Sequence, residues 1–181
     1  MITTPSSPSA TEEVFHSGEQ LLQTQLGVRD RLAAMGPALL RDHMPDQHRE
    51  LFGKLPTLLL GALDTQGQPW ATMVSGSPGF VQTPDTLSIH IRIAPDAADP
   101  VLAALEPTAH IGILGLEPHT RRRNRLNGRV RSFDAHGLSV DVVQSFGNCP
   151  KYIQAREPQH QPRTPFAPQA LGPTLNAAAL E

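Results

Sequence analysis

The sequence predicts an α+β domain built on a small antiparallel β-barrel. The hydrophobic period changes near residue 57, from helical spacing to strand-like runs. Six strand-like segments follow, and most of them are joined by tight turns. At 181 residues the chain is long enough for one domain with a substantial core. We expect that domain at 15–156, after a disordered arm at 1–14 and before a Pro/Gln-rich tail at 157–181 in which a helical composition resumes.

The N-terminal part of the domain is expected to be helical. Three segments have helical spacing between turn signals: 17–26, 28–35 and 45–55. Ser17 is expected to cap the first helix, with Gln20 completing a capping box. Gly36–Pro37 is expected to end the second helix. The third begins at a proline and has His48, Leu51, Phe52 and Leu55 on one face, which predicts that this face is buried.

The rest of the domain is expected to be mostly strands. Six segments are predicted: 57–63, 70–75, 86–92, 109–116, 121–130 and 138–143. Asp99–Pro100 predicts the start of a short helix between the third and fourth strands. Asn148 and Pro150 predict a last helix over the KYIQAR segment.

The segment 121–130, RRRNRLNGRV, has two unlike faces when read as a strand. One face holds Arg123, Arg125, Asn127, Arg129 and Arg131, and the other holds Asn124, Leu126, Gly128 and Val130. Guanidinium groups suit phosphate and carboxylate, so this face is typical of an anion-binding surface. The alternative is a solvated outer strand, in a chain with thirteen Arg against two Lys.

Composition excludes several classes of protein. The net charge of −2 argues against a dedicated nucleic-acid-binding protein. Cys149 is the only cysteine, so an intrachain disulfide cannot form, and we expect it to be a buried small side chain rather than a nucleophile. No apolar run approaches the ~20 residues of a membrane span, and no signal peptide is recognisable, so we expect a cytoplasmic protein. The histidine spacing predicts no metal site.

Three motifs, in order, carry a resemblance to a known family. DTQGQPWATMVSG, RLNGRV and QSFGNCPKYIQ resemble segments of the pyridoxamine 5′-phosphate oxidase-like FMN-binding split barrels. The similarity is closest to bacterial flavin-nucleotide-binding proteins, in which MPDQHRELF and HTRRRNRLNGRV also have counterparts. The resemblance covers 15–156 and implies a six-stranded antiparallel split barrel with Greek-key connections. It also implies a homodimer with FMN at the dimer interface.

The resemblance also implies which residues contact FMN. The strand beneath the isoalloxazine ring corresponds to Thr72, Met73, Val74, Ser75 and Gly76. Thr72 stands where the oxidases usually have a phosphate-binding arginine, and Asp99–Pro100 stands where they have an Arg-Lys pair. Trp70 begins the same strand and is expected to be a core or interface anchor.

Other positions offer a replacement for the missing cations. Arg123 stands where the oxidases have a glutamine facing the flavin, and we expect Arg123 or Arg125 to hold the phosphate. Gln144 and Ser145 resemble a Gln-Ser pair that the oxidases contribute from the second subunit. The C-terminal Trp and Arg with which the oxidases bind pyridoxal substrate have no counterpart, so pyridoxamine phosphate oxidation is not expected.

These residues predict an FMN-dependent oxidoreductase of that class, with an electron donor such as NAD(P)H. The alternative is a barrel without turnover that binds a flavin or another anionic ligand and serves a redox partner. Haem is one such ligand, with His43 or His48 as the histidine ligand.

Overall fold

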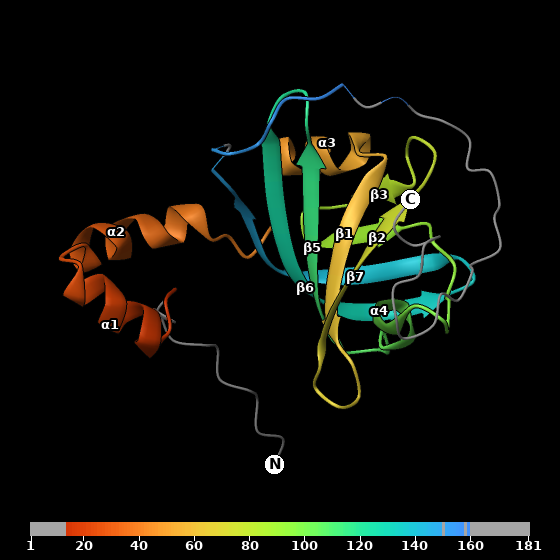
Figure 1. Ribbon diagram of the computed structural model, residues 1–181, viewed down its shortest axis with the longest axis horizontal. Coiled ribbons are helices and arrows are strands. Elements are labelled where there is room, and N and C mark those ends of the chain that lie inside the picture. The colour runs from red at the N-terminus through yellow and green to blue at the C-terminus, as the bar shows by residue number, and fades with distance from the viewer. Residues whose placement is uncertain (1–13, 150, 158, 160–181) are drawn as a thin grey trace, which may run out of the picture.

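The computed structural model describes residues 14–149, 151–157 and 159, and it contains helices at one end of the chain and a curved sheet over the rest (Figure 1). The helices are α1 (Ser17–Gln25), α2 (Arg29–Leu39), α3 (Asp46–Lys54) and α4 (Pro100–Ala103). The strands are β1 (Thr57–Leu63), β2 (Pro69–Ser75), β3 (Val81–Gln82), β4 (Ser88–Ile91), β5 (His110–Glu117), β6 (Arg122–Asp134) and β7 (Gly137–Gly147). The expected arm and most of the expected tail lie outside the described residues.

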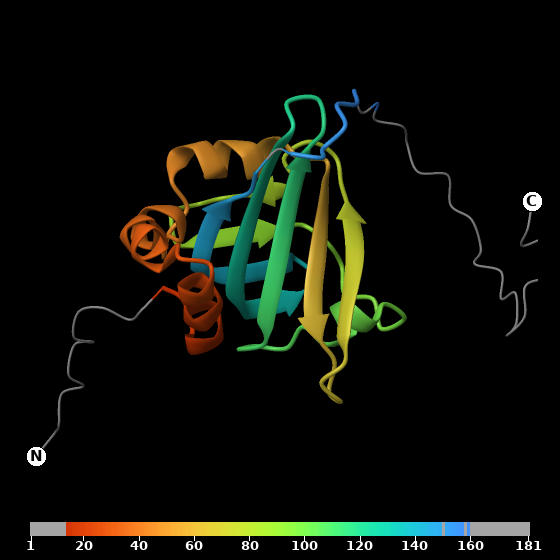
Figure 2. The ribbon, with the colours of Figure 1, turned by 60° about the vertical axis from the view of Figure 1, so that its left-hand side comes forward.

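All seven strands form one antiparallel sheet in the order β2-β1-β5-β6-β7-β4-β3. The long strands β6 and β7 connect two differently inclined halves, so that the sheet wraps around its own core (Figure 2). The α+β class is confirmed. The six-strand barrel is not confirmed, because β3 also pairs with β4 along Val81↔Ile91 in a seven-stranded sheet whose two ends are β2 and β3. A two-residue strand carries no readable alternation, which is why the sequence did not predict it.

The two faces of β6 are as the sequence predicted. From Asn124 to Arg131 the residues alternate between buried and exposed, with all the arginines of that stretch exposed. Register shifts after Asn127 and after Val130 bend the strand where the sheet curves. One face of β6 therefore contributes to the core, and the other displays guanidinium groups.

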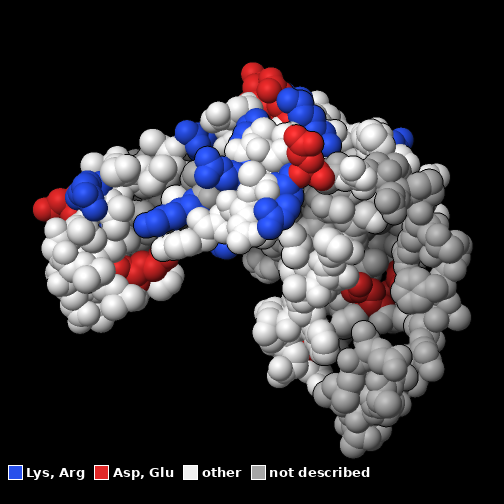
Figure 3. Space-filling model, turned by 45° about the horizontal axis from the view of Figure 1, so that its top comes forward, with Lys and Arg blue, Asp and Glu red and all other residues white. Residues whose placement is uncertain are grey.

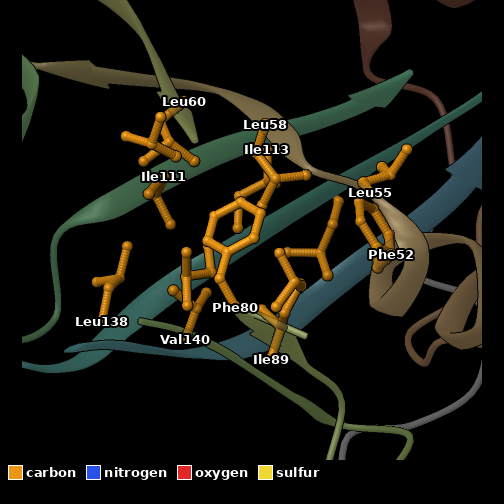
Figure 4. Packing of buried hydrophobic residues seen from close by; sticks show 14 of the residues in the cluster. Phe52, Leu55, Leu58, Leu60, Phe80, Ile89, Ile111, Ile113, Leu138 and Val140 are labelled. Atoms are coloured by element: carbon orange, nitrogen blue, oxygen red, sulfur yellow. The ribbon is translucent and has the colours of Figure 1, made fainter. Parts of the chain in front are cut away.

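The core lies between the inner face of the sheet and α3 (Figure 4). Leu58, Leu60, Ile111 and Ile113 from β1 and β5 meet Phe52 and Leu55 from α3, while Leu138, Val140, Ile89 and Phe80 close the other side. Burial of each large apolar side chain stabilises the fold by about 1.5–3 kcal/mol. The buried face predicted for 45–55 is confirmed, since His48, Leu51 and Phe52 are buried on α3 and Leu55 follows it.

The N-terminal helices differ from the expectation at their ends. The imidazole of His16 caps α1 and Glu19 completes the capping box, so the expected Ser17–Gln20 pair lies one residue too late. Helix α2 continues past Gly36 to Leu39, because Val14 and Phe15 pack closely on Gly36 and hold the helix there. The α1–α2 pair extends away from the sheet (Figure 1).

The helix expected after Asn148 does not form in the described residues. Residues 151 and 152 form a turn, and 153–157 have no regular structure. Tyr152 has φ +72°, a left-handed conformation that a continuing helix does not allow. None of the helices in the described ranges is long and apolar enough to cross a membrane.

Candidate functional site

A row of small and amide side chains crosses the outer face of the sheet over five strands. The register pairs Ala71 with Gly61, Gly61 with Gly112, Gly112 with Asn127, and Asn127 with Gln144. We call these five residues the cross-strand row. Because neighbouring strands are about 4.8 Å apart, the row spans roughly 19 Å. Its first three members have almost no side chain, so the surface is flat there.

A groove of about 500 Å³ lies over four residues of this row: Gly61, Gly112, Asn127 and Gln144. Its lining residues come from five strands: Gly61, Ala62, Leu63, Pro69, Trp70, His110, Ile111, Gly112, Asn127, Gly128, Val143 and Gln144. The Trp70 side chain is half exposed, and its indole N–H donates to Asp64 at 3.0 Å. Because Trp70 pairs with Ala62, it has the parity of the inward-facing positions of β2, and the bond to Asp64 holds its ring near the β1–β2 turn.

The two glycines of the row are not required by packing inside the chain. A Cβ on Gly112 would lie 3.8 Å from the Asn127 side-chain oxygen and 3.9 Å from the Gly61 carbonyl oxygen, which are ordinary contacts. A Cβ on Gly61 would lie 3.6 Å from the Trp70 carbonyl oxygen. By contrast, a Cβ on Gly115 of the same strand would come within 2.6 Å of Leu55. The bare surface at Gly61 and Gly112 therefore fits a flat group lying on the sheet from outside.

The other end of the row is polar. The Asn127 side-chain N–H donates to the Gln144 side-chain oxygen at 3.0 Å. Each amide keeps further donor and acceptor capacity, because an amide offers two N–H groups and a carbonyl oxygen. The pair can therefore recognise a ligand edge that carries both acceptors and donors.

Two arginines flank Asn127 on the same face of β6. Arg125 and Arg129 are each two residues from Asn127, or about 7 Å along the strand. Both are exposed, and neither side chain has a hydrogen bond or ion pair within the described part of the chain. Sequence reasoning singled out Arg125 but gave Arg129 no role of its own.

The structure separates the residues predicted to contact FMN. Gln144 lines the groove, and Met73 is exposed beside the row, opposite Leu59. Val74 is a core residue, and Gly76 packs against the Phe80 ring. Ser75 is exposed at the end of β2, away from the groove.

The side chains of two other residues predicted to contact FMN are already bound to groups of the same chain. Arg123 is partly buried and donates to the Cys149 carbonyl oxygen at 3.1 Å. Ser145 is completely buried, and its hydroxyl lies 2.8 Å from Nδ1 of His48. Cys149 is exposed, so the expectation that it is buried is wrong; it follows the end of β7, outside the core.

Thr72 and Asp99 show what replaces the missing cations. The Thr72 hydroxyl donates to the Asp99 carboxylate at 2.5 Å, and the same carboxylate accepts the backbone N–H groups of Val101 and Leu102. Burial opposes ionisation of Asp99, but these hydrogen bonds outweigh it and lower its pKa. A carboxylate thus occupies the place where the resemblance puts a phosphate grip, so FMN phosphate does not fit there.

The histidines considered as haem ligands lie away from the groove. His43 is exposed and paired with Asp42, and His48 is buried against Ser145. His110 lines the groove instead, and only the register of β5 against β6 reveals it. Within the described residues, no cluster of three or more His, Cys, Asp or Glu side chains has metal-binding geometry.

No family model and no curated protein matches this chain. Solved structures that are similar include HupZ of Group A Streptococcus, at 11% identity and a TM-score of 0.46 over 57% of this chain and 93% of that one. An FMN-binding protein from Syntrophomonas wolfei has 13% identity and a TM-score of 0.44 over 73% and 97%. HutZ, the heme storage protein of Vibrio cholerae, has 13% identity and a TM-score of 0.36 over 57% and 96%.

Proposed function

We propose that this chain binds FMN on the outer face of its sheet and is a flavin-dependent oxidoreductase. The observation that carries the proposal is the cross-strand row. A flat floor at Ala71, Gly61 and Gly112 ends in the hydrogen-bonded amides of Asn127 and Gln144. An isoalloxazine ring has the matching properties, since it is planar and its pyrimidine edge alternates carbonyl oxygens with an N–H.

The residues of the row would orient the ring. Asn127 and Gln144 would pair with the pyrimidine edge, and Leu63 and Pro69, which pair across β1 and β2, would limit the far end of the groove. When bound, the flavin supplies the hydride or electron transfer, with a donor such as NAD(P)H. The chain supplies a flat surface that excludes water from one face of the ring. We assign no acid or base in the groove.

Arg125 is the best-placed phosphate ligand in this pose. It is exposed, unpaired in the described residues, and about 7 Å along β6 from Asn127. Arg123 lies about 13 Å from Asn127 and is already engaged with the Cys149 carbonyl. A charge-assisted hydrogen bond from the Arg125 guanidinium to the phosphate would replace the phosphate contacts that Thr72 and Asp99 cannot make.

The apolar surface beside the row favours a homodimer that covers the flavin. Met73 is 67% exposed and Leu59 is 39% exposed, and they face each other across β1 and β2. Such contiguous apolar surface is typical of an interface. An isologous pairing would bring the same surface of the partner over the groove and close it from outside.

A second candidate is a non-catalytic barrel that binds haem. The observation in its favour is His110, an exposed imidazole at the groove, since imidazole is a common axial ligand. The loss of haem binding in His110→Ala, with unchanged FMN binding, would separate the two ligands.

Reconstitution tests the proposal. Purified protein mixed with FMN and then desalted should retain the visible absorption of the flavin, with the bands shifted from those of free FMN. Oxidation of NAD(P)H faster than by free FMN would establish an enzyme rather than a carrier. Protein that stays colourless after incubation with excess FMN would refute the proposal.

A further inference from the structure

A second group of polar residues lies at the end of the sheet beneath α3, on the opposite face of β6 from the flavin groove. Its centre is His48, which is only 4% exposed. Nδ1 of His48 bonds the Ser145 hydroxyl, and the backbone of Ser145 exchanges two hydrogen bonds with Arg41, at 2.7 and 3.2 Å. The end of β7 therefore holds Arg41 and His48 next to each other.

Arg122 is the second cationic side chain near the His48 imidazole. Its guanidinium donates to the Gln47 carbonyl oxygen on α3 at 2.8 Å. Burial lowers the pKa of His48, and the charges of Arg41 and Arg122 lower it further. Arg41, through its backbone pairing with Ser145, and Arg122, through its bond to the Gln47 carbonyl, both adjoin His48.

The carboxylates nearest to these arginines are bound elsewhere. Glu117 is paired with Arg122 by strand register, but its side chain is hydrogen-bonded by Thr120 and lies 3.8 Å from His119. Asp42 is paired with His43, and Asp46 with Arg49. Among the described residues, neither Arg41 nor Arg122 forms a salt bridge. Figure 3 shows Lys and Arg side chains gathered at this end of the molecule, with few acidic side chains among them.

Unsatisfied polar atoms lie in the same place. Asn124 is two residues from Arg122 on the same face of β6 and is 6% exposed, yet its side-chain N–H₂ has no partner in the described structure. The side-chain oxygen of Asn148 is also buried and has no partner among the described residues, while its backbone N–H donates to the Arg123 carbonyl. A buried donor without a partner costs about 1–3 kcal/mol, so such a group calls for an acceptor.

We propose that this end of the sheet binds a phosphate group between Arg41 and Arg122, beside His48 and Asn124. Two guanidinium groups that have no carboxylate partner among the described residues match its charge and geometry, and the Asn124 amide supplies a neutral donor. Because this cluster and the cross-strand row lie on opposite faces of β6, the phosphate is not that of FMN lying over the row of the same protomer. The site takes free phosphate or the phosphate of a second small molecule.

Titration of the full chain with inorganic phosphate at constant ionic strength tests the proposal. Saturable shifts of the His48 imidazole resonances in NMR are expected. Arg41→Gln and Arg122→Gln should each weaken binding roughly 10- to 100-fold, as expected for the loss of one charged hydrogen bond. Arg121→Gln removes the same charge from an exposed neighbour and should leave the affinity unchanged. A response that never saturates, or an equal loss in Arg121→Gln, would overturn the site.

Two further measurements distinguish the loss of a phosphate contact from misfolding and from competition with FMN. Arg41→Lys keeps the positive charge but lacks the planar guanidinium group. It should bind phosphate with an affinity between those of the wild type and Arg41→Gln, whereas a misfolded variant would not bind phosphate. Saturation with FMN should leave the phosphate affinity unchanged, while competition would overturn the assignment to a second ligand. If FMN does not bind at all, the titration with inorganic phosphate can still be measured. Failure of the proposed flavin binding and failure of the proposed phosphate site are therefore distinguishable.

Discussion

Gly61 of β1 lies directly opposite Gly112 of β5, and neither glycine is needed for contacts within the chain. Both are partly exposed, and glycines in the middle of strands weaken a sheet, since they add entropy to the unfolded backbone and have no side chain to pack. The arrangement is explained if something flat lies on it.

Substitution at Gly112 separates binding from folding. Gly112→Ala should leave the free energy of unfolding unchanged or slightly raised, because the new Cβ makes only ordinary contacts. It should lower the affinity for FMN roughly tenfold or more, since a methyl group beneath a flat ring costs about 1–3 kcal/mol of binding free energy. Urea unfolding and FMN fluorescence quenching measure the two effects.

Gly115 provides the matched control on the same strand. A Cβ there would collide with Leu55 and Phe52, so Gly115→Ala should lower the free energy of unfolding by about 1–3 kcal/mol. The folded fraction should bind FMN normally. Wild-type FMN affinity in Gly112→Ala would contradict the proposed position of the ring.

The phosphate contact is tested by comparing two ligands. Arg125→Ala should lower the affinity for FMN about 10- to 100-fold, through the loss of ~1.5–3 kcal/mol of binding free energy. The affinity for riboflavin should change much less, because riboflavin has no phosphate. Arg123→Ala should have a smaller effect, since its guanidinium is already bound to Cys149. Isothermal titration of each variant with each ligand gives the comparison.

Arg121 and Arg129 are the controls for this contact. An equal loss in Arg121→Ala would indicate long-range attraction, which salt screens, instead of a contact. If Arg129→Ala rather than Arg125→Ala shows the FMN-specific loss, the flavin lies in the opposite direction along β6.

The proposed dimer depends on the apolar surface of β1 and β2. Met73→Glu puts a charge on a side chain that is 67% exposed, so the isolated protomer should fold normally. Across an apolar interface the same charge should be destabilising, and the variant should sediment as a monomer at micromolar concentration. Wild-type protein that is itself monomeric with and without FMN would contradict the dimer.

His48 predicts a pH dependence of stability. Its pKa is lowered in the folded state, so the unfolded chain binds the proton more tightly. The contribution of His48 to stability is therefore complete above about pH 6.5, the usual histidine pKa, and is lost as the pH falls from there toward the lowered value. Urea unfolding between pH 7.5 and about pH 5 should show this loss, and His48→Gln should flatten it. His136→Gln, at an exposed turn, should leave the slope unchanged.

The sequence predicts those parts of the fold that depend on local pattern. The bounds of β1, the two faces of β6 and the buried face of α3 all follow from hydrophobic spacing. The expected helix after Asn148 relied on capping residues alone, and no apolar face supports a helix there. Strand β3 is too short to show a pattern.

The site was less predictable than the fold, because its geometry depends on register between distant strands. Gly61, Gly112 and Asn127 are far apart in the sequence and come together only through the pairing of β1, β5 and β6. Likewise, the engagement of Thr72 by Asp99 depends on how α4 packs against β2. The arginine face of β6 could be recognised, but which arginine adjoins the groove could not.

The hydrogen bond between His48 and Ser145 also has a consequence for the order of folding. It joins residues 97 positions apart, across nearly the whole sheet in sequence. A contact of such separation closes a long loop of chain, and its entropic cost is met only when the intervening strands have already paired. We therefore expect α3 to become locked onto the sheet late, after β7 has been added. Until then, a nascent chain emerging from the ribosome would leave the His48 end of α3 exposed to solvent, although Phe52 and Leu55 could already pack on β1 and β5.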